Sequence, residues 1–303
     1  MKKAIIIVAF ALLLTESLFA MDAMDMQNFI YLRDSGIVLP HLHPIAGIDY
    51  ISTSTDKTYD REWDKEDIYG TYERSAIWYS IGFGLGDMFE TRLFIPTLTH
   101  SLESDYLTVR KDESSGASDI WLTTKFAFIQ KPYLSFRFGV KFPTGDDTPP
   151  SNKLPTGDGQ TDLDFSILSA YQPEQAGVAY NVSVGYRLRF EQEESPQYSG
   201  YDFDPADEGH FALYIGGKPV EYFGILFGGN GFISTSDDRI SSSGFSRNLD
   251  DTWRAYFQVG TIIKGYSPIG VNLRADFHFD VAGKNEPAGF TWGMGVEYIP
   301  RFY

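Results

Sequence analysis

The sequence predicts an all-β protein, a transmembrane antiparallel up-and-down β-barrel of about twelve strands. Three observations lead to this prediction. An N-terminal export signal is followed by no apolar stretch of the roughly 20 residues that a membrane-spanning helix needs. Many segments alternate between apolar and polar residues, as strands with two chemically different faces do. The connections between these segments are short and long in turn, which is the pattern of up-and-down barrels in membranes.

The N-terminus has the layout of a secretory signal. Lys2 and Lys3 precede the apolar run 4–14, which has the length of a signal core and is too short to span a bilayer. We therefore expect a signal peptide over residues 1–20, cleaved after Ala20, with an uncleaved anchor as the alternative. The chain contains no cysteine, so it carries no disulfide framework and no lipid-attachment cysteine.

The rest of the chain divides into a short segment and one barrel. Residues 21–43 precede the first strand, and we expect them to form a periplasmic segment or a plug folded into the lumen. The barrel covers residues 44–303. The whole chain is rich in aromatic residues, with 24 Phe, 19 Tyr and 5 Trp, although its mean hydropathy is only -0.22. Because only helices and closed barrels satisfy their backbone polar groups in lipid, an exported chain of this kind is a membrane barrel or a secreted β-protein.

The alternation is clearest over residues 269–281, where Leu273, Phe277 and Phe279 share one face while Arg274 and Asp276 share the other. Residues 178–190 and 134–142 repeat this pattern. Soluble antiparallel sheets alternate as well, so the pattern alone does not decide between the two classes. Strands of membrane length are predicted at 44–53, 75–85, 88–97, 118–128, 133–143, 160–171, 177–190, 209–216, 220–232, 251–264, 268–282 and 288–299.

The connections predict the orientation of the barrel. Short turns are expected around Gly86-Asp87, Gln130-Lys131, Pro173-Glu174, Gly217-Lys218 and Tyr266-Ser267. The six longer connections hold 24 acidic and 9 basic residues, in a chain of net charge -16. We therefore expect short periplasmic turns, long acidic extracellular loops and both termini in the periplasm.

This acidity has two interpretations. It is either a solvated surface, or it binds divalent cations shared with lipopolysaccharide phosphates. It argues against nucleic acid as a partner, because phosphate binding requires clustered Lys and Arg. Outer-membrane lipid and lipopolysaccharide are the expected surroundings of the barrel, and the oligomeric state stays open.

If the apolar faces meet lipid, the polar faces line the lumen. Turn positions place Asp162 opposite Arg187 and Asp119 opposite Lys141, both favourable cross-strand pairs. Such a lumen is either a water-filled, charge-selective path or a salt-bridged packing that closes a narrow barrel. The predicted lumen-lining residues are Asp119, Lys125, Arg137, Lys141, Asp162, Asp164, Arg187, Arg189, Arg254, Arg274, Asp276, His278 and Asp280.

Three segments carry a family resemblance. Gly116-Ala117-Ser118-Asp119-Ile120-Trp121 with Lys125-Phe126 looks like a G-x-x-D strand entry, Val140-Lys141-Phe142-Pro143-Thr144-Gly145-Asp146 like a P-T-G-D strand exit, and Gly159-Gln160-Thr161-Asp162 with Gly185-Tyr186 continues the pattern. Together they resemble the outer-membrane transporter-like family named after the meta-pathway of phenol degradation. The resemblance covers about 116–190, and it implies an outer-membrane barrel that admits small, often aromatic, hydrophobic compounds.

Two features of these segments qualify the resemblance. P-T-G-D occurs again at 155–158, and its residue types suit tight turns, so a turn role is expected rather than contact with a ligand. The chain ends at Tyr303, one residue out of phase with the predicted outward stripe of the last strand, and Pro300 interrupts that strand.

The sequence therefore predicts an outer-membrane channel for passive uptake of a small molecule, with no cofactor and no metal. Two other classes of function stay open. One is a non-transport surface or structural protein whose acidic loops do the work. The other is a lipid hydrolase, because His278 shares a face with Asp276 and Asp280, although no nucleophile motif accompanies it.

Overall fold

The computed structural model describes residues 35–104, 111–148, 153–195, 201–242, 245–249 and 252–300. The predicted signal peptide, most of the predicted 21–43 segment and Tyr303 lie outside the described residues. In the described part of the chain, no helix is long and apolar enough to cross a membrane.

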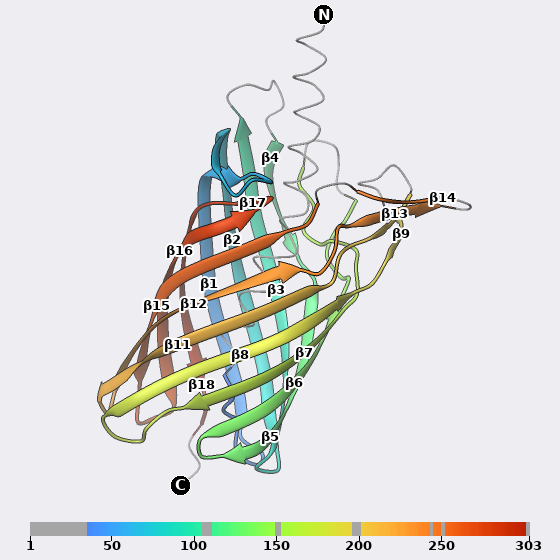
Figure 1. Cartoon of the computed structure of the whole chain (residues 1–303). Helices are drawn as coiled ribbons and strands as arrows, with labels where there is room; N and C mark the ends of the chain where they lie inside the picture. The colour runs from blue at the N-terminus through green and yellow to red at the C-terminus, as the bar shows by residue number, and fades with distance from the viewer. Residues whose placement is uncertain are drawn as a thin grey trace, which may run out of the picture.

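Twelve strands close into one antiparallel barrel, which confirms the predicted fold class (Figure 1). All twelve predicted segments are strands of this barrel. The barrel strands are β1 (Pro44–Tyr59), β2 (Lys65–Leu85), β3 (Phe89–Ser104), β5 (Ile120–Gln130), β6 (Tyr133–Phe142), β7 (Asp162–Tyr171), β8 (Gly177–Arg189), β11 (Glu208–Val220), β12 (Phe223–Ser234), β15 (Ala255–Tyr266), β16 (Val271–Lys284) and β18 (Phe290–Tyr298).

The seam joins the first strand to the last. β1 pairs with β2 on one side and with β18 on the other, from Ala46 opposite Tyr298 to Ser54 opposite Phe290. The ladder ends at Tyr298, two residues before Pro300, whose ring nitrogen offers no donor to a neighbouring strand. Within the described residues, each of the twelve barrel strands pairs with a neighbour on both sides.

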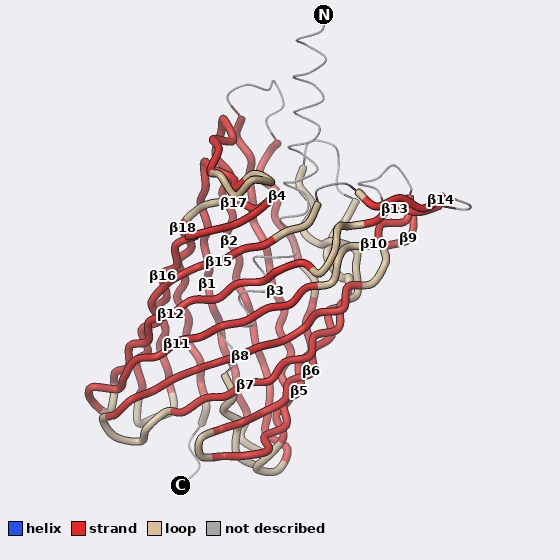
Figure 2. The backbone as a smooth tube through the Cα atoms, in the orientation of Figure 1, coloured by secondary structure: helices blue, strands red, loops and turns tan. Residues whose placement is uncertain are grey.

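The two ends of the barrel differ. Figure 2 shows short turns at one end and longer connections at the other. We call these the short-turn end and the long-loop end. Four of the five short turns lie where the sequence predicts them. The turn predicted at Gly217-Lys218 is wrong. Strand β11 continues past Gly217, through an irregular register, to Val220, and the turn falls at 221–222.

The long connections contain strands of their own. β4 (Lys111–Ala117) pairs with β3 beyond the point where β5 does, so β4 and β5 form one strand interrupted at Ser118 and Asp119. β17 (Glu286–Pro287) extends the seam along β1. A second sheet projects from the long-loop end (Figure 1), and it consists of β9 (Gln192–Ser195), β10 (Tyr201–Asp204), β13 (Arg239–Ser242) and β14 (Phe245–Asn248).

The two faces of the wall have opposite chemistry. On β8, Val184 is 61% exposed on the outside, while the adjacent Ser183 is 1% exposed on the inside. On β16, Phe279 is 56% exposed and the adjacent Asp280 is 6% exposed. A belt of large apolar side chains therefore surrounds the barrel, while charged groups are packed within it. This arrangement is the reverse of a soluble β-protein and suits lipid outside.

Candidate functional site: the lumen

The structure places the predicted lumen residues on the inner face of the wall. Arg274 is the most open of them, with a side chain 12% exposed, and the other twelve are buried. The buried residues are Asp119, Lys125, Arg137, Lys141, Asp162, Asp164, Arg187, Arg189, Arg254, Asp276, His278 and Asp280. The described lumen residues form three zones, of which two lie side by side toward the long-loop end and one lies at the short-turn end.

The first zone joins the wall to the connection 143–161. Lys141 of β6 forms ion pairs with Asp158 of that connection and with Asp162 of β7, the latter at 2.8 Å between Nζ and Oδ2. Burial alone would raise the pKa of Asp158, but Lys141 and Arg189 hold it below its ordinary value. These contacts draw the connection toward the inner wall.

Asp119 clamps the same connection. Its carboxylate accepts backbone N–H groups from Thr144 at 3.0 Å, Gly145 at 2.9 Å and Asp158 at 3.1 Å. The predicted cross-strand pair of Asp119 with Lys141 is wrong, because Trp121 is the residue opposite Lys141. The interrupted strand leaves Asp119 between β4 and β5, where it can reach the backbone of both P-T-G-D segments.

The second zone is a buried ion-pair network on β6, β7, β8, β11 and the residues before β15. Asp164 accepts from His210 Nε2 at 2.7 Å and from Arg137 Nη2 at 3.1 Å. Glu208 binds Arg187 and Arg189, each at 3.1 Å, and Arg254 at 3.4 Å. In this zone the described side chains form a salt-bridged packing, one of the two arrangements the sequence allowed.

The predicted pair of Asp162 with Arg187 is also wrong. Asp162 lies opposite Arg189, and Asp164 lies opposite Arg187. The observed register differs from the predicted one by two residues, so each side chain keeps its predicted face and changes only its partner.

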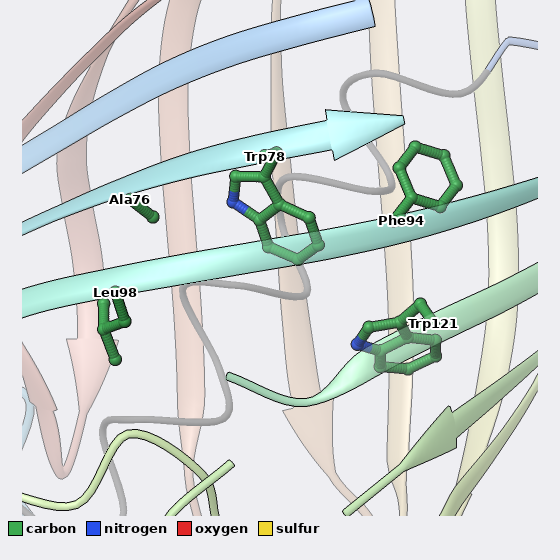
Figure 3. Packing of buried hydrophobic residues seen from close by; sticks show 5 residues of the cluster. All are labelled: Ala76, Trp78, Phe94, Leu98 and Trp121. Atoms are coloured by element: carbon green, nitrogen blue, oxygen red, sulfur yellow. The ribbon is translucent and has the colours of Figure 1, made fainter. Parts of the chain in front are cut away.

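Apolar side chains also line the lumen, a feature that the sequence analysis missed. Trp78 of β2, Phe94 of β3 and Trp121 of β5 are at most 2% exposed and cluster with Ala76 and Leu98. Figure 3 shows these five side chains on three neighbouring strands. One signal in the sequence could have predicted this cluster. Residues 75–85 carry apolar side chains on both faces, with Ile77 and Tyr79 outward and Trp78 inward.

The third zone, at the short-turn end, contains open space. A cavity of about 400 Å³ lies there, bounded mainly by β1, β2, β3, β15, β16, β18 and residues 35–40. Aromatic and charged side chains share its wall, among them Phe94, Tyr266, Arg92, Lys264, Arg274 and Glu297. Arg92 reaches Glu297 at 3.0 Å across the two intervening strands β2 and β1.

His278, which the sequence offered as a candidate catalytic residue, and His41, which precedes β1, both contact neighbouring parts of the barrel. His278 Nε2 lies 3.3 Å from Asp276 Oδ2, and its Nδ1 lies 3.3 Å from the Tyr214 hydroxyl, so its described partners include no serine nucleophile. His41 Nδ1 accepts the backbone N–H of Gly86 at 2.8 Å, which caps the first short turn.

Comparison with known proteins identifies the family. The family model described as "Putative MetA-pathway of phenol degradation" matches residues 54–293, from β1 into β18. The chain belongs to this family. The resemblance inferred from the three motifs is confirmed, and the phenol-degradation family match extends far beyond them. A search of curated protein sequences gives no match.

The fold is shared with a solved outer-membrane channel. The COG4313 outer membrane channel from Pseudomonas putida F1 is 13% identical, with a TM-score of 0.71 over 87% of this chain and 97% of that chain. The translocator domain of autotransporter NalP from Neisseria meningitidis is 13% identical, with a TM-score of 0.49 over 92% of this chain and 95% of that one. This member of the phenol-degradation family is an outer-membrane β-barrel, so its short-turn end is the periplasmic end and its long-loop end is extracellular.

Proposed function

We propose that this protein is an outer-membrane channel for passive movement of small molecules, aromatic compounds among them. The observation that carries the proposal is the cavity of about 400 Å³ inside the periplasmic half of the barrel. This volume lies in the range of sites for small organic ligands. A barrel serving only as a structural element would be expected to fill that space with side chains, as it does in the ion-pair network nearer the extracellular end.

The wall of the cavity supports a permeant with mixed chemistry. Phe94 belongs to the apolar cluster with Trp78 and Trp121, and it also borders the cavity. Arg92 and Glu297 offer polar contacts beside it. A small aromatic molecule with a polar substituent can place its ring against Phe94 and its substituent against Arg92 or Glu297. The name of the family agrees with such a permeant.

A vesicle assay tests the channel directly. Purified protein in lipid vesicles should increase the uptake of small aromatic solutes over protein-free vesicles, and a series of aromatics, sugars and ions defines the permeant class. Asn272→Trp places a bulky ring in the cavity wall and should slow uptake several-fold. Ala275→Trp, on the outward face of the same strand, is the matched control and should transport like the parent.

Two outcomes would remove the proposal. Vesicles carrying the folded barrel that take up no solute faster than protein-free vesicles contradict a channel. Equal uptake by Asn272→Trp and by the parent would show that the permeant does not pass this cavity.

A surface role is the second candidate, and the projecting sheet of β9, β10, β13 and β14 favours it. This sheet lies beyond the barrel wall, and its Tyr201 and Phe245 are 41% and 47% exposed. Removing the sheet should leave uptake unchanged if transport is the main function. The lipid-hydrolase alternative predicts lipid cleavage that is lost in His278→Ala, and the contacts of His278 with Asp276 and Tyr214 support a packing role instead.

One expectation from the sequence concerns the contact of the acidic extracellular connections with lipopolysaccharide. We propose that the acidic extracellular connections are solvated or bind divalent cations shared with lipopolysaccharide. Removing such cations with a chelator would lower the stability of the barrel in lipopolysaccharide only in the second case.

A further inference from the structure

A short peptide segment lies inside the periplasmic end of the barrel. Residues 35–39, which precede β1, contact the inner wall through their backbone. Lys125 Nζ of β5 donates to the carbonyl oxygens of Ser35 at 3.0 Å and Ile37 at 2.8 Å. We call residues 35–39 the strap.

Two further side chains hold the strap. The Ser135 hydroxyl of β6 donates to the Gly36 carbonyl at 2.6 Å, and Glu90 of β3 accepts the Leu39 N–H at 2.8 Å. Glu90 and Lys125 are themselves 3.1 Å apart, and both side chains are 1% exposed. One buried ion pair therefore offers both a donor and an acceptor to a passing backbone.

Close packing supports the same placement. A Cβ atom built on Gly36 would lie 3.1 Å from the Ala170 nitrogen of β7, and one on Gly84 would lie 2.6 Å from the Leu39 oxygen. At both positions a larger side chain would keep the neighbouring backbone away, and glycine allows the close approach. Val38 and Leu39 are 4% and 5% exposed, so the strap is packed rather than loosely enclosed.

The strap divides the space at the periplasmic end. Ser35 and Ile37 border the cavity of about 400 Å³ on the side of β1, β16 and β18. The same two residues border a pocket of only about 20 Å³ on the side of β7, β8 and β12. The strap therefore stands between the open space and the opposite wall.

We propose that the strap is a gate at the periplasmic exit, and that Lys125, Glu90 and Ser135 form the latch that holds it closed. This inference rests on the proposed channel function. The strap is held by side-chain contacts to single backbone groups, and within the described residues it joins no strand ladder. It can therefore leave the wall without opening the barrel. Its release would merge the two spaces and widen the exit.

A single-cysteine experiment separates the strap from the channel, since the chain has no native cysteine. Val38→Cys places a unique thiol at a strap side chain that is only 4% exposed and does not border the cavity, so its reaction with a water-soluble maleimide measures release from the wall. In the barrel reconstituted in lipid vesicles, we expect slow labelling in this parent. Lys125→Met should increase the rate about tenfold, the factor expected from losing a hydrogen bond to a charged group. Glu90 keeps Arg92 as an ion partner in this variant.

The controls are matched in kind. Lys218 is a buried lysine at the same end, and its Nζ donates to the Glu174 carbonyl at 2.8 Å, while no described hydrogen bond joins it to the strap. Lys218→Met should leave the labelling rate unchanged. Ser135→Ala removes one neutral hydrogen bond with little risk to folding, and it should give a smaller increase than Lys125→Met.

Conductance across a planar bilayer supplies the second readout. Lys125→Met should increase the open probability or conductance, and Lys218→Met should not. Labelling that is equally fast in the parent, Lys125→Met and Ser135→Ala overturns the latch. Faster labelling with unchanged conductance, in a parent that conducts, overturns the gate and leaves the channel intact. If neither the parent nor the variants conduct, although the labelling rates are as expected, the proposed channel is wrong and the proposed gate with it.

Discussion

Gly145 and Gly157, the glycines of the two P-T-G-D segments, pack against each other. A Cβ atom on Gly145 would lie 2.6 Å from the Gly157 Cα, and one on Gly157 would lie 2.7 Å from the Gly145 Cα. The Asp146 carbonyl accepts the Thr156 N–H at 2.8 Å, which joins the two copies. The repeated motif therefore folds as one unit on the inner side of the wall.

A methyl group at this contact should destabilise the barrel. We expect Gly145→Ala to lower the free energy of unfolding by about 1–3 kcal/mol, the usual effect of overpacking against atoms that have no room to move. Urea unfolding in lipid vesicles measures this. Gly265→Ala is the control, because its Cβ would meet only the Leu273 Cβ at an ordinary 3.5 Å. Equal effects of the two substitutions would contradict the contact.

Removal of the Asp119 carboxylate should release the connection 143–161. Asp119→Ala loses the acceptor of three backbone N–H groups, so the connection should leave the wall more often. Lys153 is exposed in this connection, and tryptic cleavage after it should become faster in the folded barrel. Among the described residues, the Asp146 carboxylate accepts only the exposed Thr148 N–H, so Asp146→Ala should leave the cleavage rate near that of the parent. Unchanged cleavage in Asp119→Ala would show that other contacts hold the connection.

The sequence predicted the strands and their faces because burial on one side imposes a period of two that residues such as Phe277 and Asp276 display directly. It did not predict partners across strands. A bulge between Ala127 and Ile129 and a turn centred on 131–132 shift β5 against β6, which moves Lys141 from Asp119 to Trp121. Bulges and turn geometry depend on backbone conformation, and the alternation of apolar and polar residues does not predict that conformation.

The interior was harder to predict than the wall. The alternation predicted polar side chains at the inward positions, whereas Trp78 and Trp121 face inward and are almost fully buried. Part of their cover comes from the charged network, since the Arg187 guanidinium lies 5.3 Å from the Trp121 ring centre. Contacts of this kind join strands far apart in the sequence, and no local pattern predicts them.

Glu208 should be a strong determinant of stability. It is the shared partner of Arg187, Arg189 and Arg254, and Glu208→Gln would leave three buried guanidinium groups with less negative charge. Breaking a buried ion pair typically lowers the free energy of unfolding by about 3–5 kcal/mol. Glu174→Gln is the matched control, because the pair of Glu174 with Lys131 is exposed and such pairs contribute about 0–1 kcal/mol. Urea unfolding of both variants compares them, and similar losses would contradict the described network.

The orientation of the wall predicts opposite behaviour for two adjacent residues. Val184 is 61% exposed on the outer face, and Ser183 is 1% exposed on the inner face. In single-cysteine variants, a spin label at Val184→Cys should be broadened by a lipid-soluble relaxation agent, whereas a label at Ser183→Cys should be protected from it. The distinction holds because a shift of one residue along a strand exchanges the two faces completely. An arginine at Val184 should also lower the free energy of unfolding by up to about 2–4 kcal/mol, according to its depth in the bilayer. If the label at Ser183→Cys met the lipid and the label at Val184→Cys did not, apolar side chains would form the core, and the cavity at the periplasmic end would not be a passage through a membrane.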